Sequence, residues 1–99
     1  MTKQETFDII VNHLRKQRCK SAENSKCLYR GPNNTKCAAG ILIPDKDYIP
    51  QMEYANINDG HNIGLVFDMQ HVHDNCHINN WEEHFRFFAN LHRLKYECN

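Results

Sequence analysis

The sequence lacks long apolar runs and any excess of charge. Its longest apolar stretch, residues 38–43, is far shorter than the roughly 18 residues of a membrane-spanning helix. Basic and acidic side chains number 12 each, so the net charge is zero. Domains that bind nucleic acid usually carry a basic surface. We therefore expect neither a membrane nor a nucleic acid as partner, and a nucleic-acid-binding regulator would have to use the basic side chains of one segment. These are Arg15, Lys16, Arg18, Lys20, Lys26, Arg30 and Lys36.

Signals for export, disulfide bonding and catalysis are also missing. The first residues contain no apolar core and no cleavage site, so we expect a cytoplasmic protein. Five cysteines are an odd number, and in a reducing compartment they would be free thiols or metal ligands. The sequence has no nucleophile elbow, no glycine-rich phosphate loop and no His-Glu-x-x-His motif. No reaction class is therefore predicted, and a binding role is favoured over an enzyme.

A chain of 99 residues is the size of one domain, and its clearest element is an N-terminal helix. Thr2 and Glu5 have the spacing of a capping box. Four apolar residues then recur at helical spacing and predict a helix over residues 3–18. They are Phe7, Ile10, Val11 and Leu14.

The rest of the chain predicts two more helices and a β-hairpin. A short β-type run begins at Cys27, turn residues follow at 31–34, and a second arm over 36–43 would complete a hairpin at 27–43. One helical turn is expected around 51–54. Apolar residues spread around the axis predict a helix buried on more than one side over 61–74, and an aromatic stripe predicts another over 81–95, with Asn80 and Glu83 as a cap pair. The predicted fold is α+β and mainly α, with three helices packed around a small β-hairpin.

Residues 27–54 contain a specific motif, CLYRGPNNTKCAAGILIPDKDYIPQMEY. It resembles the pattern C-x-Y-R-G-P-x-G-x-K-C-A-x-G-x-L-I-P-D followed by Y-x-P-x-M-E-G, which is typical of a family of short proteins encoded by phages and in bacterial genomes. The later Val72-His73-Asp74 and Trp81 also fit. Asn34 or Thr35 stands where that family usually has glycine, and Tyr54 replaces the glycine after Met-Glu. No activity is assigned to the family, so the resemblance implies a phage or prophage setting rather than a chemistry.

Histidine is abundant, with seven in the chain, and several cluster with a cysteine near residue 75. Imidazole, thiolate and carboxylate are zinc ligands. A zinc site is therefore a candidate, although Cys27 and Cys37 are too far apart in sequence for a usual ligand pair. Its candidate ligands are Cys27, Cys37, His73, Cys76 and His77. The simpler alternative is that no metal is bound, that the two earlier cysteines are small buried side chains, and that His73 and Asp74 cap a helix end.

His73 and Asp74 also suggest a general base with an orienting carboxylate, with Cys27 or Cys37 as nucleophile. Adjacent residues rarely point at each other within a helix, although they can at its end. No other motif supports this chemistry, so we regard it as the weaker interpretation.

A partner-binding surface is predicted from the motif and from charge. Residues 1–36 carry eight basic and three acidic side chains (+5), whereas residues 37–85 carry one and eight (−7) and residues 86–99 restore +2. These charges either pair within the fold or form a face for a partner. An aromatic and a guanidinium at the turn would be a good contact point, unless Arg30 bonds loop carbonyls or Asp45 and Tyr29 packs inside. The candidate partner-binding residues are Tyr29, Arg30, Asp45, Asp47 and Glu53.

The aromatic stripe of the last helix favours self-association. If Phe87 lies opposite Phe85, one ring is left for a second surface, and a homodimer is the simple explanation. The sequence as a whole favours a small phage-encoded accessory protein that binds a host bacterial protein, with inhibition of a host defence system as the candidate outcome. The alternatives are a zinc-binding domain and a small nucleic-acid-binding regulator.

Overall fold

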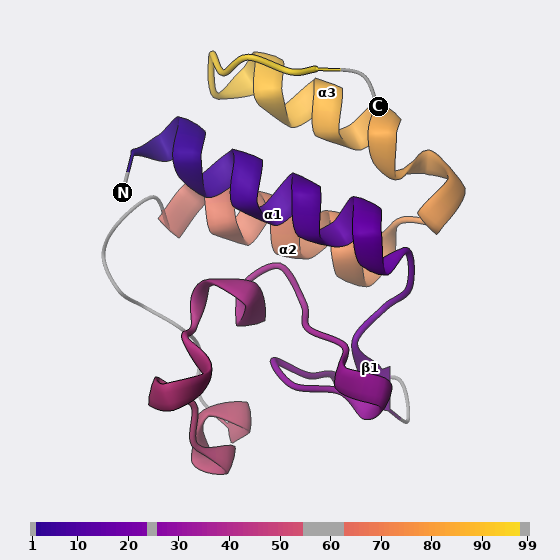
Figure 1. The fold of residues 1–99 in the computed structure, drawn as a ribbon. Coiled ribbons are helices and arrows are strands. Elements are labelled where there is room, and N and C mark those ends of the chain that lie inside the picture. The colour runs from indigo at the N-terminus through magenta and orange to yellow at the C-terminus, as the bar shows by residue number, and fades with distance from the viewer. Residues whose placement is uncertain (1, 24–25, 55–62, 98–99) are drawn as a thin grey trace.

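The computed structural model describes residues 2–23, 26–54 and 63–97, apart from the side chains of Glu23, Lys26, Cys27, Met52, Tyr54 and Ile63 (Figure 1). Three α-helices dominate these residues: α1 (Lys3–Gln17), α2 (Ile63–Asn75) and α3 (Trp81–Leu91). The predicted mainly α fold is therefore confirmed. None of these helices has both the length and the apolar content required to cross a bilayer.

Helix α1 begins and ends as its sequence indicates. The Thr2 hydroxyl accepts a hydrogen bond from the Glu5 amide (3.1 Å), and the Glu5 carboxylate accepts one from the Thr2 amide (2.9 Å). The capping box is thus confirmed, and its hydrogen bonds to Thr2 lower the pKa of Glu5. At the other end Arg18 adopts a left-handed conformation (φ 50°), and its amide donates to the Leu14 carbonyl (2.9 Å).

Helix α3 ends at Leu91, four residues before the predicted end. Arg93 is left-handed (φ 59°), its amide donates to the Asn90 carbonyl, and the Leu94 amide donates to the Ala89 carbonyl (2.7 Å). This pair of bonds is the Schellman motif that closes helices. The predicted cap at the other end was also wrong. Asn80 makes no side-chain capping bond and is the last residue of a 3₁₀ turn, η5 (Ile78–Asn80).

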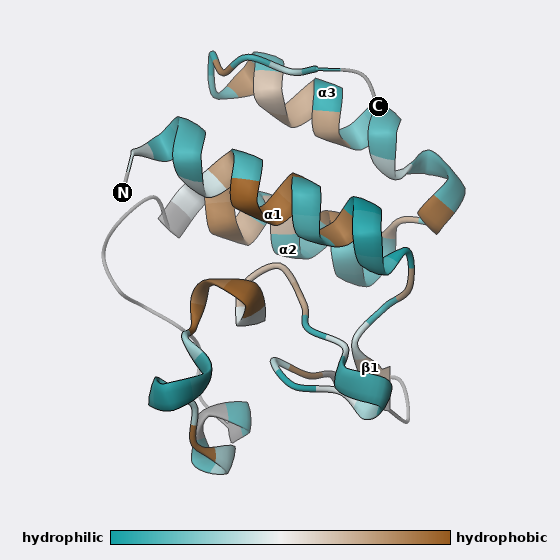
Figure 2. Cartoon of the chain, in the orientation of Figure 1, coloured by the Kyte–Doolittle hydropathy of each residue, from teal (hydrophilic) through white to brown (hydrophobic). Residues whose placement is uncertain are grey.

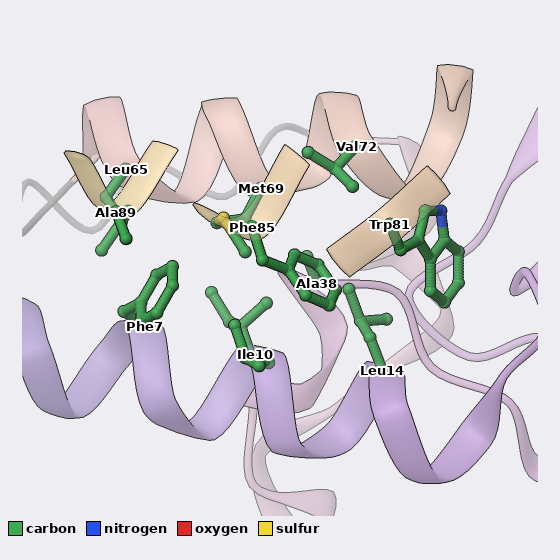
Figure 3. Packing of buried hydrophobic residues seen from close by; sticks show 11 residues of the cluster. Phe7, Ile10, Leu14, Ala38, Leu65, Met69, Val72, Trp81, Phe85 and Ala89 are labelled. Carbon is green, nitrogen blue, oxygen red and sulfur yellow. The ribbon is translucent and has the colours of Figure 1, made fainter. Parts of the chain in front are cut away.

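The core lies among the three helices. Helix α2 packs against both α1 and α3, and the buried side chains from all three meet with Ala38 between them (Figure 3). Figure 2 shows the apolar residues of α1 alternating with hydrophilic ones, as expected of a helix with one buried face. The largest completely buried apolar side chains include Ile10, Leu14, Leu65, Met69 and Phe85.

The predicted hairpin at 27–43 is not present. The ladder in the described residues joins β1 (Ala22–Glu23) to β2 (Lys26–Cys27), which overlaps that segment only at Cys27. Residues 28–54 instead run through four short 3₁₀ turns: η1 (Pro32–Asn34), η2 (Gly40–Leu42), η3 (Asp45–Asp47) and η4 (Pro50–Tyr54). The last of these confirms the helical turn expected around 51–54. Figure 2 shows η2 as the most apolar of these turns, and it packs against α1.

The C-terminal segment 94–97 lies along α1. The side-chain amide of Gln4 donates to the Lys95 carbonyl (3.1 Å) and accepts from the Lys95 amide (2.8 Å). Further along α1, Arg15 donates to the Glu97 carbonyl (2.6 Å) and also binds both carboxylate oxygens of Glu82 (2.6 and 2.8 Å). The Arg15 pair joins α1 to α3, and it lowers the pKa of Glu82.

Candidate functional site

Arg30 is the centre of the segment 28–54, which we call the motif segment. Its guanidinium donates to the carbonyls of Gly40 and Ile43 (2.7 Å each) and to the Asp45 carboxylate (3.0 Å). It also lies 4.8 Å from the centre of the Tyr48 ring, a cation–π distance. The alternative in which Arg30 binds loop carbonyls and Asp45 is therefore confirmed.

Glu53 binds the same segment through its carboxylate. Its carboxylate accepts hydrogen bonds from the amides of Tyr29 (2.9 Å) and Arg30 (3.0 Å) and from the Tyr48 hydroxyl (2.5 Å). The bond to Glu53 raises the pKa of Tyr48 to about 12, because ionising the phenol would place two anions together. Glu53 thus fixes the backbone at 29–30 by supplying the acceptor that a neighbouring strand would otherwise supply.

Four of the five predicted partner-binding residues meet in this internal network: Tyr29, Arg30, Asp45 and Glu53. Asp45 also contacts the Lys36 ammonium (3.2 Å), and Lys36 followed by Arg30 lowers the pKa of Asp45. Asp47 is exposed on η3. The ion pairs join residues from the basic 1–36 region to residues from the acidic 37–85 region, so part of the charge imbalance is paired within the fold.

The glycines of the motif permit close backbone contacts. A Cβ added at Gly40 would lie 2.3 Å from the Tyr29 carbonyl oxygen, and one at Gly31 would lie 2.4 Å from Ser21 Oγ. Residues 33 and 34 both have positive φ (58° and 62°), and the Thr35 amide donates to the Pro32 carbonyl (3.2 Å). This is the geometry of a type I′ turn, which favours Asn and Gly. The glycine usual in the resembling family therefore fits at Asn34.

The motif segment is tied to α1 at Lys36. Gln17 accepts from the Lys36 amide (2.8 Å) and donates to its carbonyl (2.9 Å), which also accepts from the His13 imidazole (2.8 Å). Burial lowers the pKa of His13. The side chains of the motif that are bonded here position the loop. Their bonds lie within the motif segment, while the Asp45 side chain remains 78% exposed.

His73 is completely buried, and both of its ring nitrogens are engaged. Nε2 accepts from the Ser21 amide (2.9 Å), so in the neutral ring Nδ1 carries the hydrogen and donates to Asp74 (2.7 Å). The ring also stacks on Trp81, with centroids 6.1 Å apart. The nitrogen needed for a general base or a metal bond therefore already has a backbone partner. Instead of capping α2, His73 ties the loop after α1 to α2.

The remaining candidate zinc ligands are held separately. Cys37 is buried, and its sulfur accepts from the Gly40 amide (3.3 Å). Cys76 is half-buried, and this burial raises the pKa of its thiol. His77 accepts from the Asn79 amide (3.1 Å). The side chain of Cys27 lies outside the described residues. Within the part of the chain that the structure describes, no three His, Cys, Asp or Glu side chains are grouped as a metal site would require.

The surface of the helices carries three large, exposed apolar side chains. We define the outer face as Phe67 of α2 with Phe87 and Leu91 of α3, whose exposed fractions are 75%, 60% and 61%. Helical periodicity places Phe67 opposite the buried Leu65, Met69 and Val72, and Phe87 opposite the buried Trp81, Phe85 and Ala89. Each of the two side chains therefore points away from the buried face of its own helix.

The sequence predicted one half of this face and missed the other. The exposure of Phe87 opposite a buried Phe85 is confirmed. Helix α2 packs against both α1 and α3, as the apolar residues spread around its axis predicted, but Phe67 is left in solvent. Comparisons with protein-family models, with curated proteins and with solved structures gave no match.

Proposed function

We propose that this chain is a small accessory protein that acts by binding another protein through the outer face. The observation that supports this is the exposure of Phe67, Phe87 and Leu91 on neighbouring helices. Large exposed apolar side chains are typical of protein interfaces, where aromatic residues often contribute most of the binding free energy. The bonds of Arg30 and Glu53 to backbone atoms of the motif segment give those two residues a structural role.

The partner in this proposal is a host bacterial protein. The motif at residues 27–54 resembles that of short phage and prophage proteins, and such a protein would meet bacterial proteins in the cytoplasm. Inhibition of a host defence system is the outcome that we propose for this binding. The buried state of His73, with both nitrogens bonded, supports a binding role rather than a hydrolytic one.

The experiment is a pull-down from bacterial lysate, followed by titration of the purified partner against variants. Phe67→Ser should weaken binding by at least about tenfold, which corresponds to about 1.4 kcal/mol. Ile49→Ser is the matched control, because Ile49 is also an exposed apolar residue (53%) but belongs to the motif segment. Equal binding by wild type and Phe67→Ser, or the same loss with Ile49→Ser, would contradict the proposal.

A further inference from the structure

We propose that α3 pairs with α3 of a second copy of this chain, antiparallel and across a two-fold axis close to Phe87. The inference rests on the proposed function, since it names a second copy as the occupant of the α3 half of the outer face. Phe67, on α2, remains for the host protein.

The contact ridge on α3 consists of Glu83, Phe87 and Leu91. These residues are four apart, so they lie along one line on the helix surface. Phe87 and Leu91 are 60% and 61% exposed, and Glu83 and Arg93 are exposed as well. The Phe87 ring is already oriented, because it meets Phe88 edge to face with ring centres 5.1 Å apart. An antiparallel copy would place Phe87 against its equivalent at the centre and Leu91 over the partner's His84.

The charges at the two ends of this ridge complement each other. Glu83 lies in the first turn of α3, and Arg93 lies at the tip of the turn that closes the helix. The midpoint between residues 83 and 93 is residue 88, next to Phe87, although Arg93 itself lies beyond the last helical residue, Leu91. A two-fold axis beside Phe87 would bring Glu83 of each chain toward the turn that carries Arg93 of the other, whereas a parallel pairing would put like charges together. Such exposed pairs add little affinity, but they determine the orientation of a complex.

Glu83 is the acidic residue that this pairing needs, because its neighbour Glu82 is engaged inside the chain. Glu82 binds Arg15 and accepts from the Tyr96 hydroxyl (2.9 Å). Of the two acidic residues at the start of α3, Glu82 thus stabilises the fold and Glu83 belongs to the interface.

The test uses charge reversal in the full chain, with sedimentation equilibrium over a concentration series. Wild type should be in monomer–dimer equilibrium. Glu83→Arg alone and Arg93→Glu alone should each weaken the dimer by about tenfold or more, because each homodimer then contains two repulsive pairs. An equimolar mixture of the two variants should regain the wild-type affinity, because both of its pairs are attractive.

Two further variants keep the result interpretable. Phe87→Ser should give a monomer, and Phe67→Ser should dimerise like wild type; far-ultraviolet circular dichroism checks that each variant is folded. A wild-type monomer throughout the series would overturn the inference. So would two single reversals that dimerise like wild type, or a mixture that gains nothing over them. A monomer that still captures a host protein through Phe67 would overturn the inference and leave the proposed function standing, whereas a charge-dependent dimer that captures none would do the opposite.

Discussion

The helices and the motif segment are stabilised by different forces. The helices share a core of apolar side chains that are almost fully removed from water, among them Leu14, Leu65 and Phe85. The motif segment has short turns instead of long helices or strands, and Arg30 and Glu53 bind its backbone directly. An apolar core tolerates changes that keep its volume, whereas a hydrogen-bonded polar network depends on each partner. The two parts should therefore respond differently to substitution.

The largest effect is expected from truncation in the core. Phe85 is completely buried between the helices, so Phe85→Ala should lower the free energy of unfolding by about 3–5 kcal/mol. Denaturant unfolding followed by circular dichroism measures this directly. If α1, α2 and α3 form one cooperative core, exchange of their amide hydrogens should accelerate together. A loss below about 1 kcal/mol would mean that the core closes around the missing ring.

A smaller and local effect is expected from Glu53→Gln. The amide nitrogen of glutamine would face one of the donors that the carboxylate now accepts, so about 1–3 kcal/mol of local stability should be lost. Amide exchange should accelerate in the motif segment, with the helices almost unchanged. Uniform acceleration throughout the chain would show that the two parts unfold as one.

The same variant makes a prediction about pH. The raised pKa of Tyr48 means that its bond to Glu53 stabilises the fold below the usual pKa near 10 and is lost as pH rises through about 12. Titration of phenolate absorbance should therefore show one tyrosine ionising near pH 12 in wild type, and at lower pH in Glu53→Gln. Identical titration curves would contradict the bond.

The smallest effect is expected at the type I′ turn. Asn34 has φ 62°, a conformation that glycine adopts without steric cost, so Asn34→Gly should raise stability by about 0.5 kcal/mol. Asn12→Gly, at an exposed position within α1, is the control and should lower stability by about 0.5 kcal/mol. Thermal unfolding of both variants checks the sign, and a destabilising Asn34→Gly would mean that the asparagine side chain contributes to the turn.

Sequence periodicity predicted the parts of the fold that depend on local rules. The Thr2–Glu5 box and the apolar spacing located α1 to within one residue. The end of α3 was missed because its left-handed residue is Arg93, where glycine is the usual signal. The hairpin was wrong because Arg30 and Glu53 satisfy the backbone of residues that looked like strands. Such bonds join residues that are 10 to 24 positions apart, and the composition of a segment does not reveal them.

For the candidate site, the sequence predicted which residues come together better than it predicted what those residues do. Tyr29, Arg30, Asp45 and Glu53 do meet in the fold, and their role in partner binding stays a prediction. His73 and Asp74 do touch, as is possible near a helix end, but the amide that occupies the imidazole belongs to Ser21, 52 residues earlier.

The bonds between Gln4 and Lys95 have a consequence for folding during synthesis. Lys95 follows Gln4 by 91 residues and is therefore synthesised much later. The side of α1 that binds the 94–97 segment stays uncovered while the intervening chain is made. Chains fold from the N-terminus as they emerge, but this helix cannot complete its contacts alone. Until the 94–97 segment is made, this side of α1 is exposed on the nascent chain, and chaperones would bind the chain during this interval.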